Sequence, residues 1–131
     1  MSADCIDMKA TDIQIGGNHY KDMIMQPIEL INTLGCSFIQ GCIIKYISRY
    51  KAKNGAQDIE KCIHYAEMAI QLKDRKYYRS DTYIKETNLF VAKNKLTILQ
   101  RGIIINALSN KYNVVITLCK ELLRIEYPEK Q

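Results

Sequence analysis

Two adjacent stretches of the chain, residues 38–53 and 56–76, carry apolar side chains at helical spacing, and Asn54-Gly55 separates them. Apolar residues that recur every three or four positions lie on one face of an α-helix. Asn-Gly is a strong turn signal, and Ser37 is a suitable N-cap for the first helix. The pattern therefore predicts a central antiparallel helix hairpin over about residues 37–76.

A shorter helix is predicted before this hairpin, over residues 27–35. Pro27 suits the first turn of a helix, and Gly35 suits its C-terminal cap. After the hairpin, the pattern predicts two further helices over roughly 83–109 and 113–126, although their β-branched runs also allow short strands. No internal repeat is apparent in the sequence.

These elements predict an all-α fold. We interpret residues 1–79 as one helical region and residues 80–131 as a C-terminal helical extension. The extension either packs in the same domain or mediates oligomerisation. Apolar stripes on nearly every helix exceed what a small monomer hides easily, so a homo-oligomer is expected.

Composition narrows the class of protein. The chain has 131 residues, which suits a single domain, and no apolar run is long enough for a membrane span. Its five cysteines are odd in number and form no CxxC pair, which is typical of reduced thiols in the cytoplasm. We expect no structural metal, no cofactor and no membrane partner.

The net charge of +5 is concentrated after residue 44, in the segments 45–53 and 73–79. A basic excess of this kind favours an anionic partner, although many charge runs are only solvated helix faces. Motifs of the common phosphate-handling enzymes are missing: the sequence contains no GxxxxGK[ST] loop and no ExxED-type magnesium cluster. A metal-dependent phosphohydrolase is not expected.

Basic and polar residues are spaced one turn apart along both helices of the predicted hairpin. They are Lys45, Arg49 and Lys53 on the first helix, and Asp58, Lys61 and Tyr65 on the second. An antiparallel hairpin can bring these two faces together, where Arg and Lys would bind a phosphate and Tyr would stack or donate a hydrogen bond. The alternative is an exposed ladder of charges that contributes little to stability.

The same positions belong to a longer ordered set of residues. This set comprises His19-Tyr20, Gln26-Pro27-Ile28-Glu29, Gly41, Lys45-Tyr46, Arg49, Lys53, Asp58, Lys61 and Tyr65. It resembles the SaV-like family of small bacteriophage proteins over about residues 17–72. One departure is Cys42, since the family usually has Asn after the helix glycine.

The resemblance implies a ligand site at the matching polar positions His19, Tyr20, Gln26, Glu29, Lys45, Arg49, Lys53, Asp58 and Lys61. The family includes a phage protein to which a host abortive-infection system responds, and a related phage protein looks like a nucleotide kinase without a P-loop. Gly16-Gly17 would let the following loop fold over the basic helix face, so that His19 donates to a phosphate and Tyr20 stacks on a base. Alternatively, this loop is a structural plug.

Three functions remain open. The leading hypothesis is a bacteriophage protein in the host cytoplasm that binds a linear or cyclic nucleotide, either to divert DNA precursors or to sequester a signal of host antiviral defence. The second is a nucleoside monophosphate kinase without a P-loop, in which Lys45 and Arg49 neutralise the transferring phosphoryl group. The third is an interaction module that contacts host defence proteins. DNA or RNA is not the expected partner.

Overall fold

The computed structural model describes residues 9–17 and 23–130, and within these ranges it contains α-helices and 3₁₀ turns but no strand. The predicted all-α class is confirmed. The α-helices are α2 (Pro27–Leu34), α3 (Phe38–Arg49), α4 (Ala56–Leu72), α5 (Thr82–Asn94), α6 (Ile98–Leu108) and α7 (Tyr112–Glu126). The 3₁₀ turns are η1 (Ala10–Asp12), η2 (Tyr50–Ala52) and η3 (Pro128–Lys130).

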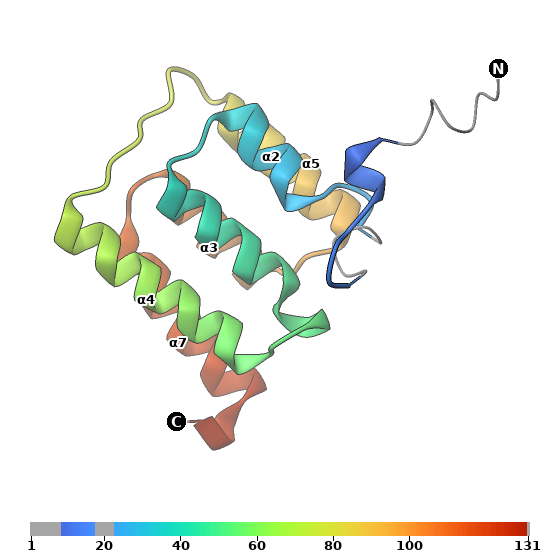
Figure 1. Ribbon diagram of the computed structural model, residues 1–131. Coiled ribbons are helices and arrows are strands. Elements are labelled where there is room, and N and C mark those ends of the chain that lie inside the picture. The colour runs from blue at the N-terminus through green and yellow to red at the C-terminus, as the bar shows by residue number, and fades with distance from the viewer. Residues whose placement is uncertain (1–8, 18–22, 131) are drawn as a thin grey trace, which may run out of the picture.

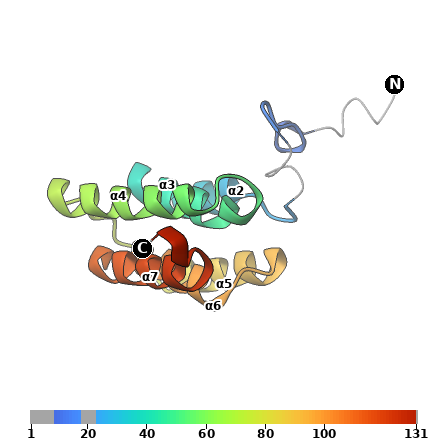
Figure 2. The same cartoon turned by 90° about the horizontal axis from the view of Figure 1, so that it is seen from below.

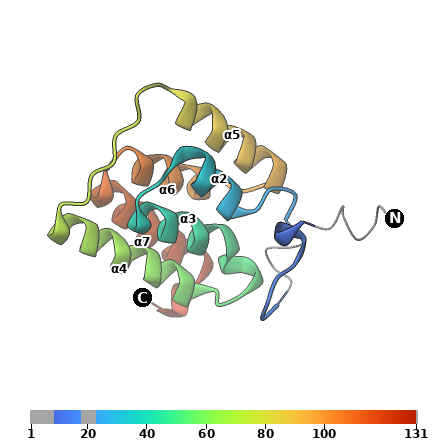
Figure 3. The same ribbon diagram turned by 45° about the horizontal axis from the view of Figure 1, so that its top comes forward.

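The helices form two layers. Figure 1 shows α2, α3 and α4 side by side in front, and Figure 2 shows α5, α6 and α7 as a second layer beneath them. Each helix of one layer contacts its counterpart in the other: α2 contacts α5, α3 contacts α6, and α4 contacts α7. Figure 3 shows the same pairing, with α5 beyond α2 and with α6 and α7 behind α3 and α4.

The core lies between the layers, and both layers contribute aliphatic side chains to it. Its fully buried aliphatic side chains include Ile43, Ile44 and Ile47 from α3, and Ile103, Ile104 and Leu108 from α6. Most of the apolar stripes seen in the sequence are therefore covered within one chain. No helix in the described part of the chain is long and apolar enough to cross a membrane.

The prediction of one helix over 83–109 is wrong. The chain breaks between α5 and α6 because Lys95 adopts a left-handed conformation with φ of 54° and caps α5. The next helix then starts at a capping box, in which the Thr97 hydroxyl accepts from the Gln100 N–H and the Gln100 side chain accepts from the Thr97 N–H. Such a reciprocal pair satisfies donors that the first turn of a helix leaves free.

The two layers share one three-helix arrangement, a structural repeat that is not apparent in the sequence. Gly35 caps α2 in the left-handed conformation that Lys95 adopts sixty positions later, and Ser37 and Gln40 form the same capping box as Thr97 and Gln100. In both copies the residue after the left-handed cap donates its N–H to a carbonyl five positions back.

Hydrogen bonds between the layers follow the same correspondence. The Gln40 side chain donates to the Ala107 carbonyl oxygen at 3.1 Å, and the Gln100 side chain donates to the Ile47 carbonyl oxygen at 2.9 Å. Each donor lies near the start of its helix and each acceptor near the end of the other, so α3 and α6 are antiparallel and related by a quasi-two-fold rotation. We call α2–α4 the N-terminal unit and α5–α7 the C-terminal unit.

Candidate functional site

The largest described cavity has a volume of about 710 Å³ and opens beside the N-terminal unit. Its walls come from four parts of the chain: the segment Ile13–Ile15 after η1, and the helices α2, α3 and α4. The lining side chains used below are Ile28, Phe38, Cys42, Lys45, Tyr46 and Tyr65. A cavity of this size that is mostly apolar and has a few polar groups is typical of small-molecule sites.

One residue in the cavity lining is a glycine of α3 that faces α2. Gly41 faces Ile31 of α2 so closely that a Cβ atom at this position would lie 3.3 Å from Ile31 Cγ2. Gly41 therefore lets α2 pack closely against α3, and α3 presents no side chain of its own to α2 at this position. The segment Ile13–Ile15, which forms another wall of the cavity, follows η1. This turn is held to α2 because the Gln26 side chain donates to the Thr11 carbonyl oxygen of η1.

Aromatic rings and cations meet at the α4 end of the cavity. The rings of Tyr46 and Tyr65 stack with centroids 5.9 Å apart and an angle of 18° between their planes. Phe38 approaches Tyr65 edge-on at 6.4 Å. Three cationic groups surround the Tyr46 ring: Lys45 Nζ at 5.2 Å, Arg49 Cζ at 4.7 Å and Lys61 Nζ at 4.9 Å from its centroid.

Arg49 is not the exposed surface residue that the sequence suggested. Its side chain is only 8% exposed, and that of Asp58 is fully buried. Arg49 Nε lies 3.2 Å from Asp58 Oδ2, and Nη2 lies 3.3 Å from Oδ1, so the pair is bidentate. This ion pair connects α3 to the first turn of α4 and holds a guanidinium group beside the Tyr46 ring.

The structure brings together most of the residues predicted on the hairpin. Lys61 joins the group because its Nζ lies 3.9 Å from Asp58 Oδ1. Lys53 does not join it: α3 ends at Arg49, and Lys53 is exposed after the turn η2. A helix that ends four residues early no longer carries Lys53 on the predicted face.

The remaining predicted residues lie on the other side of the cavity or outside the described ranges. Glu29 caps α2, since its Oε2 accepts the Gln26 N–H at 2.6 Å, while Gln26 also lines the cavity. His19 and Tyr20 lie outside the described residues, so their predicted roles stay predictions.

Sequence reasoning missed Phe38 and gave Tyr46 no role in the ligand site. Tyr46 is in fact the centre of the aromatic and cationic cluster, half-buried between α3 and α4. A signal was available: Tyr46 follows Lys45 and precedes Arg49 by three residues, so its ring lies within reach of both side chains. The sequence offered less evidence for Phe38. An aromatic residue in the first turn of a helix usually packs inward, whereas Phe38 is 77% exposed.

Two cysteines, Cys36 and Cys42, line this cavity, and burial raises the pKa of both thiols, so neither is an activated nucleophile. Burial raises the pKa of the Cys42 thiol, and this effect outweighs the hydrogen bond with Tyr65 and the charge of Lys45, which lower it. The thiol is therefore protonated near neutral pH, and only a thiolate attacks efficiently. Cys36, Cys42, Cys62 and Cys119 are all free.

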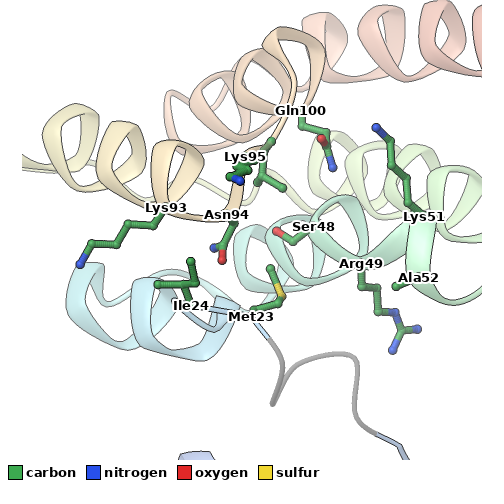
Figure 4. A pocket seen from close by; sticks show the side chains of 11 residues that line it. Met23, Ile24, Ser48, Arg49, Lys51, Ala52, Lys93, Asn94, Lys95 and Gln100 are labelled. Carbon is green, nitrogen blue, oxygen red and sulfur yellow. The ribbon is translucent and has the colours of Figure 1, made fainter.

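A second cavity of about 400 Å³ lies between the end of α3 and the turn from α5 to α6. Its basic lining residues are Arg49, Lys51, Lys93 and Lys95. Figure 4 shows that Arg49 and Lys93 point away from the centre of this cavity in different directions. Because these charges diverge, the second cavity is a poorer match to a single phosphate group than the first.

Within residues 9–17 and 23–130, no group of three or more His, Cys, Asp or Glu side chains is placed to hold a metal ion. In the part of the chain that the structure describes, the helices and the lining residues together define a small, two-layered all-α protein with an aromatic and basic cleft.

Residues 16–67 match the model of a family described as a protein of unknown function, DUF3310. The match ends within α4 and therefore includes the whole cluster from Lys45 to Tyr65. No curated protein and no solved structure matches the chain significantly. The DUF3310 match does not test the resemblance to SaV-like phage proteins, which stays a prediction.

Proposed function

We propose that the protein binds a phosphorylated nucleotide in the cleft between α2, α3 and the Tyr46–Tyr65 pair. The observation that carries this proposal is that Lys45 lines a cavity of about 710 Å³ together with Phe38, Tyr46 and Tyr65, and that two further cations lie around the same Tyr46 ring. Aromatic faces accept a base by stacking, and Lys binds phosphate as a point charge. The cavity therefore offers a surface for the base and a charge for the phosphate.

The residues divide into two roles in this proposal. Lys45, Tyr65 and Phe38 line the cavity and contact the nucleotide directly. Arg49 and Asp58 form a buried pair whose geometry fixes α3 against α4. The pair acts as a positioning element for Tyr46, while Lys61 adds positive charge beside the same ring.

Binding rather than turnover is the proposed activity. Given the resemblance to SaV-like proteins, we propose that the protein acts in a host cytoplasm during bacteriophage infection and withdraws nucleotides, either DNA precursors or a nucleotide signal of antiviral defence. A P-loop-independent kinase would instead convert the bound nucleotide. A contact with a host defence protein would need no nucleotide at all.

Calorimetric titration with ribo- and deoxyribonucleotides, including cyclic forms, tests the site. Lys45→Ala should weaken the binding of the nucleotide found by roughly ten- to a hundredfold, because a hydrogen bond to a charged group is lost. Lys93→Ala is the matched control, since it removes the same charge from the second cavity. Equal losses for both variants would indicate diffuse attraction and contradict the cleft as the site.

The same titrations separate the three functions. Saturable binding without product supports sequestration, whereas transfer of a phosphoryl group that disappears in Lys45→Ala supports the kinase. If the folded protein binds no nucleotide at all, the remaining hypothesis is the interaction module. Binding in the cleft should also weaken with salt, because Lys45 and Lys61 are only partly buried.

Self-association, in our proposal, uses the apolar rim of the cleft. Exposed side chains gather there: Ile13 is 56% exposed, Ile15 95%, Ile28 60% and Phe38 77%. Most other apolar stripes are buried between the layers, so this rim is the surface on which two copies would meet.

Light scattering tests this association. The chain has a mass of 15.2 kDa, and we expect the wild-type protein at micromolar concentration to have at least twice that mass. Phe38→Asp should shift the protein toward the monomer, because it places a charge in the apolar contact. Ile98→Asp is the control: Ile98 begins α6 as Phe38 begins α3 and is 89% exposed, but it lies outside the rim. A wild-type monomer, or equal effects of both variants, would contradict the proposal.

A further inference from the structure

The quasi-two-fold relation gives the cleft residues of α2 and α3 counterparts sixty positions later, in α5 and α6. Gly41, which presents no side chain to α2, corresponds to Arg101 of α6. Arg101 Nε donates to Asn88 Oδ1 at 2.7 Å, and Asn88 occupies the position of the cavity residue Ile28. A hydrogen-bonded side chain therefore connects α5 and α6 at the position where α3 has only a glycine.

The chemistry of the cleft is also missing from the C-terminal unit. Lys45 corresponds to Ile105, so the phosphate-binding charge is absent there. Tyr46 corresponds to Asn106, whose amide donates at 2.7 Å to the Gly102 carbonyl oxygen of its own helix. The position of the stacking ring is thus occupied by a short side chain that is turned back on α6.

The packing residues, by contrast, are preserved. Gln40 corresponds to Gln100, and both make the same hydrogen bond across the layers. Ile43 and Ile44 correspond to Ile103 and Ile104, and all four side chains are fully buried. What the two units share is the surface by which they hold each other, and what they do not share is the cleft.

We infer that the C-terminal unit is a degenerate copy of the N-terminal unit, which has kept the packing surface and lost the ligand site, so that each chain binds one nucleotide. The inference rests on the proposed function. It assigns Arg101 the role of closing the second groove, whereas Gly41 adds no side chain to the first.

Stoichiometry by calorimetry, using the tightest-binding nucleotide of the panel above, tests the inference in the full-length chain. The wild-type protein should bind one nucleotide per chain. Gly41→Arg, which copies the C-terminal residue into the cleft, should weaken binding by roughly a hundredfold or more. Arg101→Gly should still bind one nucleotide per chain, with an affinity within about twofold of wild type.

A second pair of variants covers the case in which Gly41→Arg fails to fold, since Ile31 lies so close. Lys45→Ile should lose roughly ten- to a hundredfold in affinity, and Ile105→Lys, the reverse exchange, should lose none. Circular dichroism verifies that each variant is folded.

The outcomes separate the two proposals. Two nucleotides per chain, or an equal loss of affinity for Arg101→Gly and Lys45→Ile, would overturn the degenerate copy while nucleotide binding stands. A wild-type protein that binds no nucleotide would overturn both.

Discussion

Asp58→Ala is expected to lower the free energy of unfolding by about 3–5 kcal/mol, because it leaves the buried guanidinium of Arg49 without its bidentate carboxylate. The Asp58 carboxylate is fully buried and the Arg49 side chain is 8% exposed, so water replaces the lost partner poorly. Urea unfolding followed by circular dichroism measures the change.

Two controls make the result specific to burial. Glu121→Ala removes a carboxylate from the pair with Arg124, whose side chains are 41% and 63% exposed, and this variant should unfold at nearly the wild-type urea concentration. The double variant Arg49→Met/Asp58→Leu should be more stable than Asp58→Ala, because a buried ion pair can often be replaced by apolar side chains. If Asp58→Ala and Glu121→Ala destabilise the protein equally, the pair is not buried in solution.

Ile43→Ala and Ile103→Ala should each lower the free energy of unfolding by about 2–5 kcal/mol, the usual cost of truncating a fully buried isoleucine. The two residues are counterparts in the two units and lie in the core between the layers. Because each unit covers the apolar face of the other, we expect one unfolding transition in both variants, shifted to lower urea concentration.

The comparison of the two variants also tests whether the layers depend on each other. Circular dichroism reports the helices of both units, and the fluorescence of the tyrosines reports their local packing. Coincident transitions are expected from both probes. A biphasic curve in which only one phase moves in Ile103→Ala would show that the C-terminal unit unfolds independently.

Local side-chain chemistry explains which parts of the fold the sequence predicted. Ser37, Gly35 and Asn54-Gly55 mark helix ends through their own conformational preferences, and the ends of α2 and α3 and the start of α4 lie at or within a few residues of them. The break after α5 was missed because Lys95, a residue that ordinarily continues a helix, takes the left-handed cap. Thr97 and Gln100 were the available signal, since Thr-x-x-Gln is a capping box.

The structure places several of the predicted side chains near one another, although their role in a site stays a prediction and Lys53 lies apart from them. Helical spacing places Lys45 and Arg49 on one face of the first helix. The predicted antiparallel hairpin then turns this face toward Tyr65 on the second helix. Spacing does not reveal burial: Arg49 is enclosed by contacts that spacing within one helix does not specify. The repeat escaped notice because few residues besides the packing positions, such as Gln40 and Gln100, are the same in both units.

Joining the two units in one chain has a consequence for how they can change. A symmetric dimer of identical subunits uses the same residue on both sides of its axis, so every substitution occurs twice. In such a dimer Gly41 could not become arginine on one side alone, and a change that closed one groove would close both. A covalent link removes that restriction, because positions 41 and 101 are encoded separately. Each can therefore be substituted without changing the other.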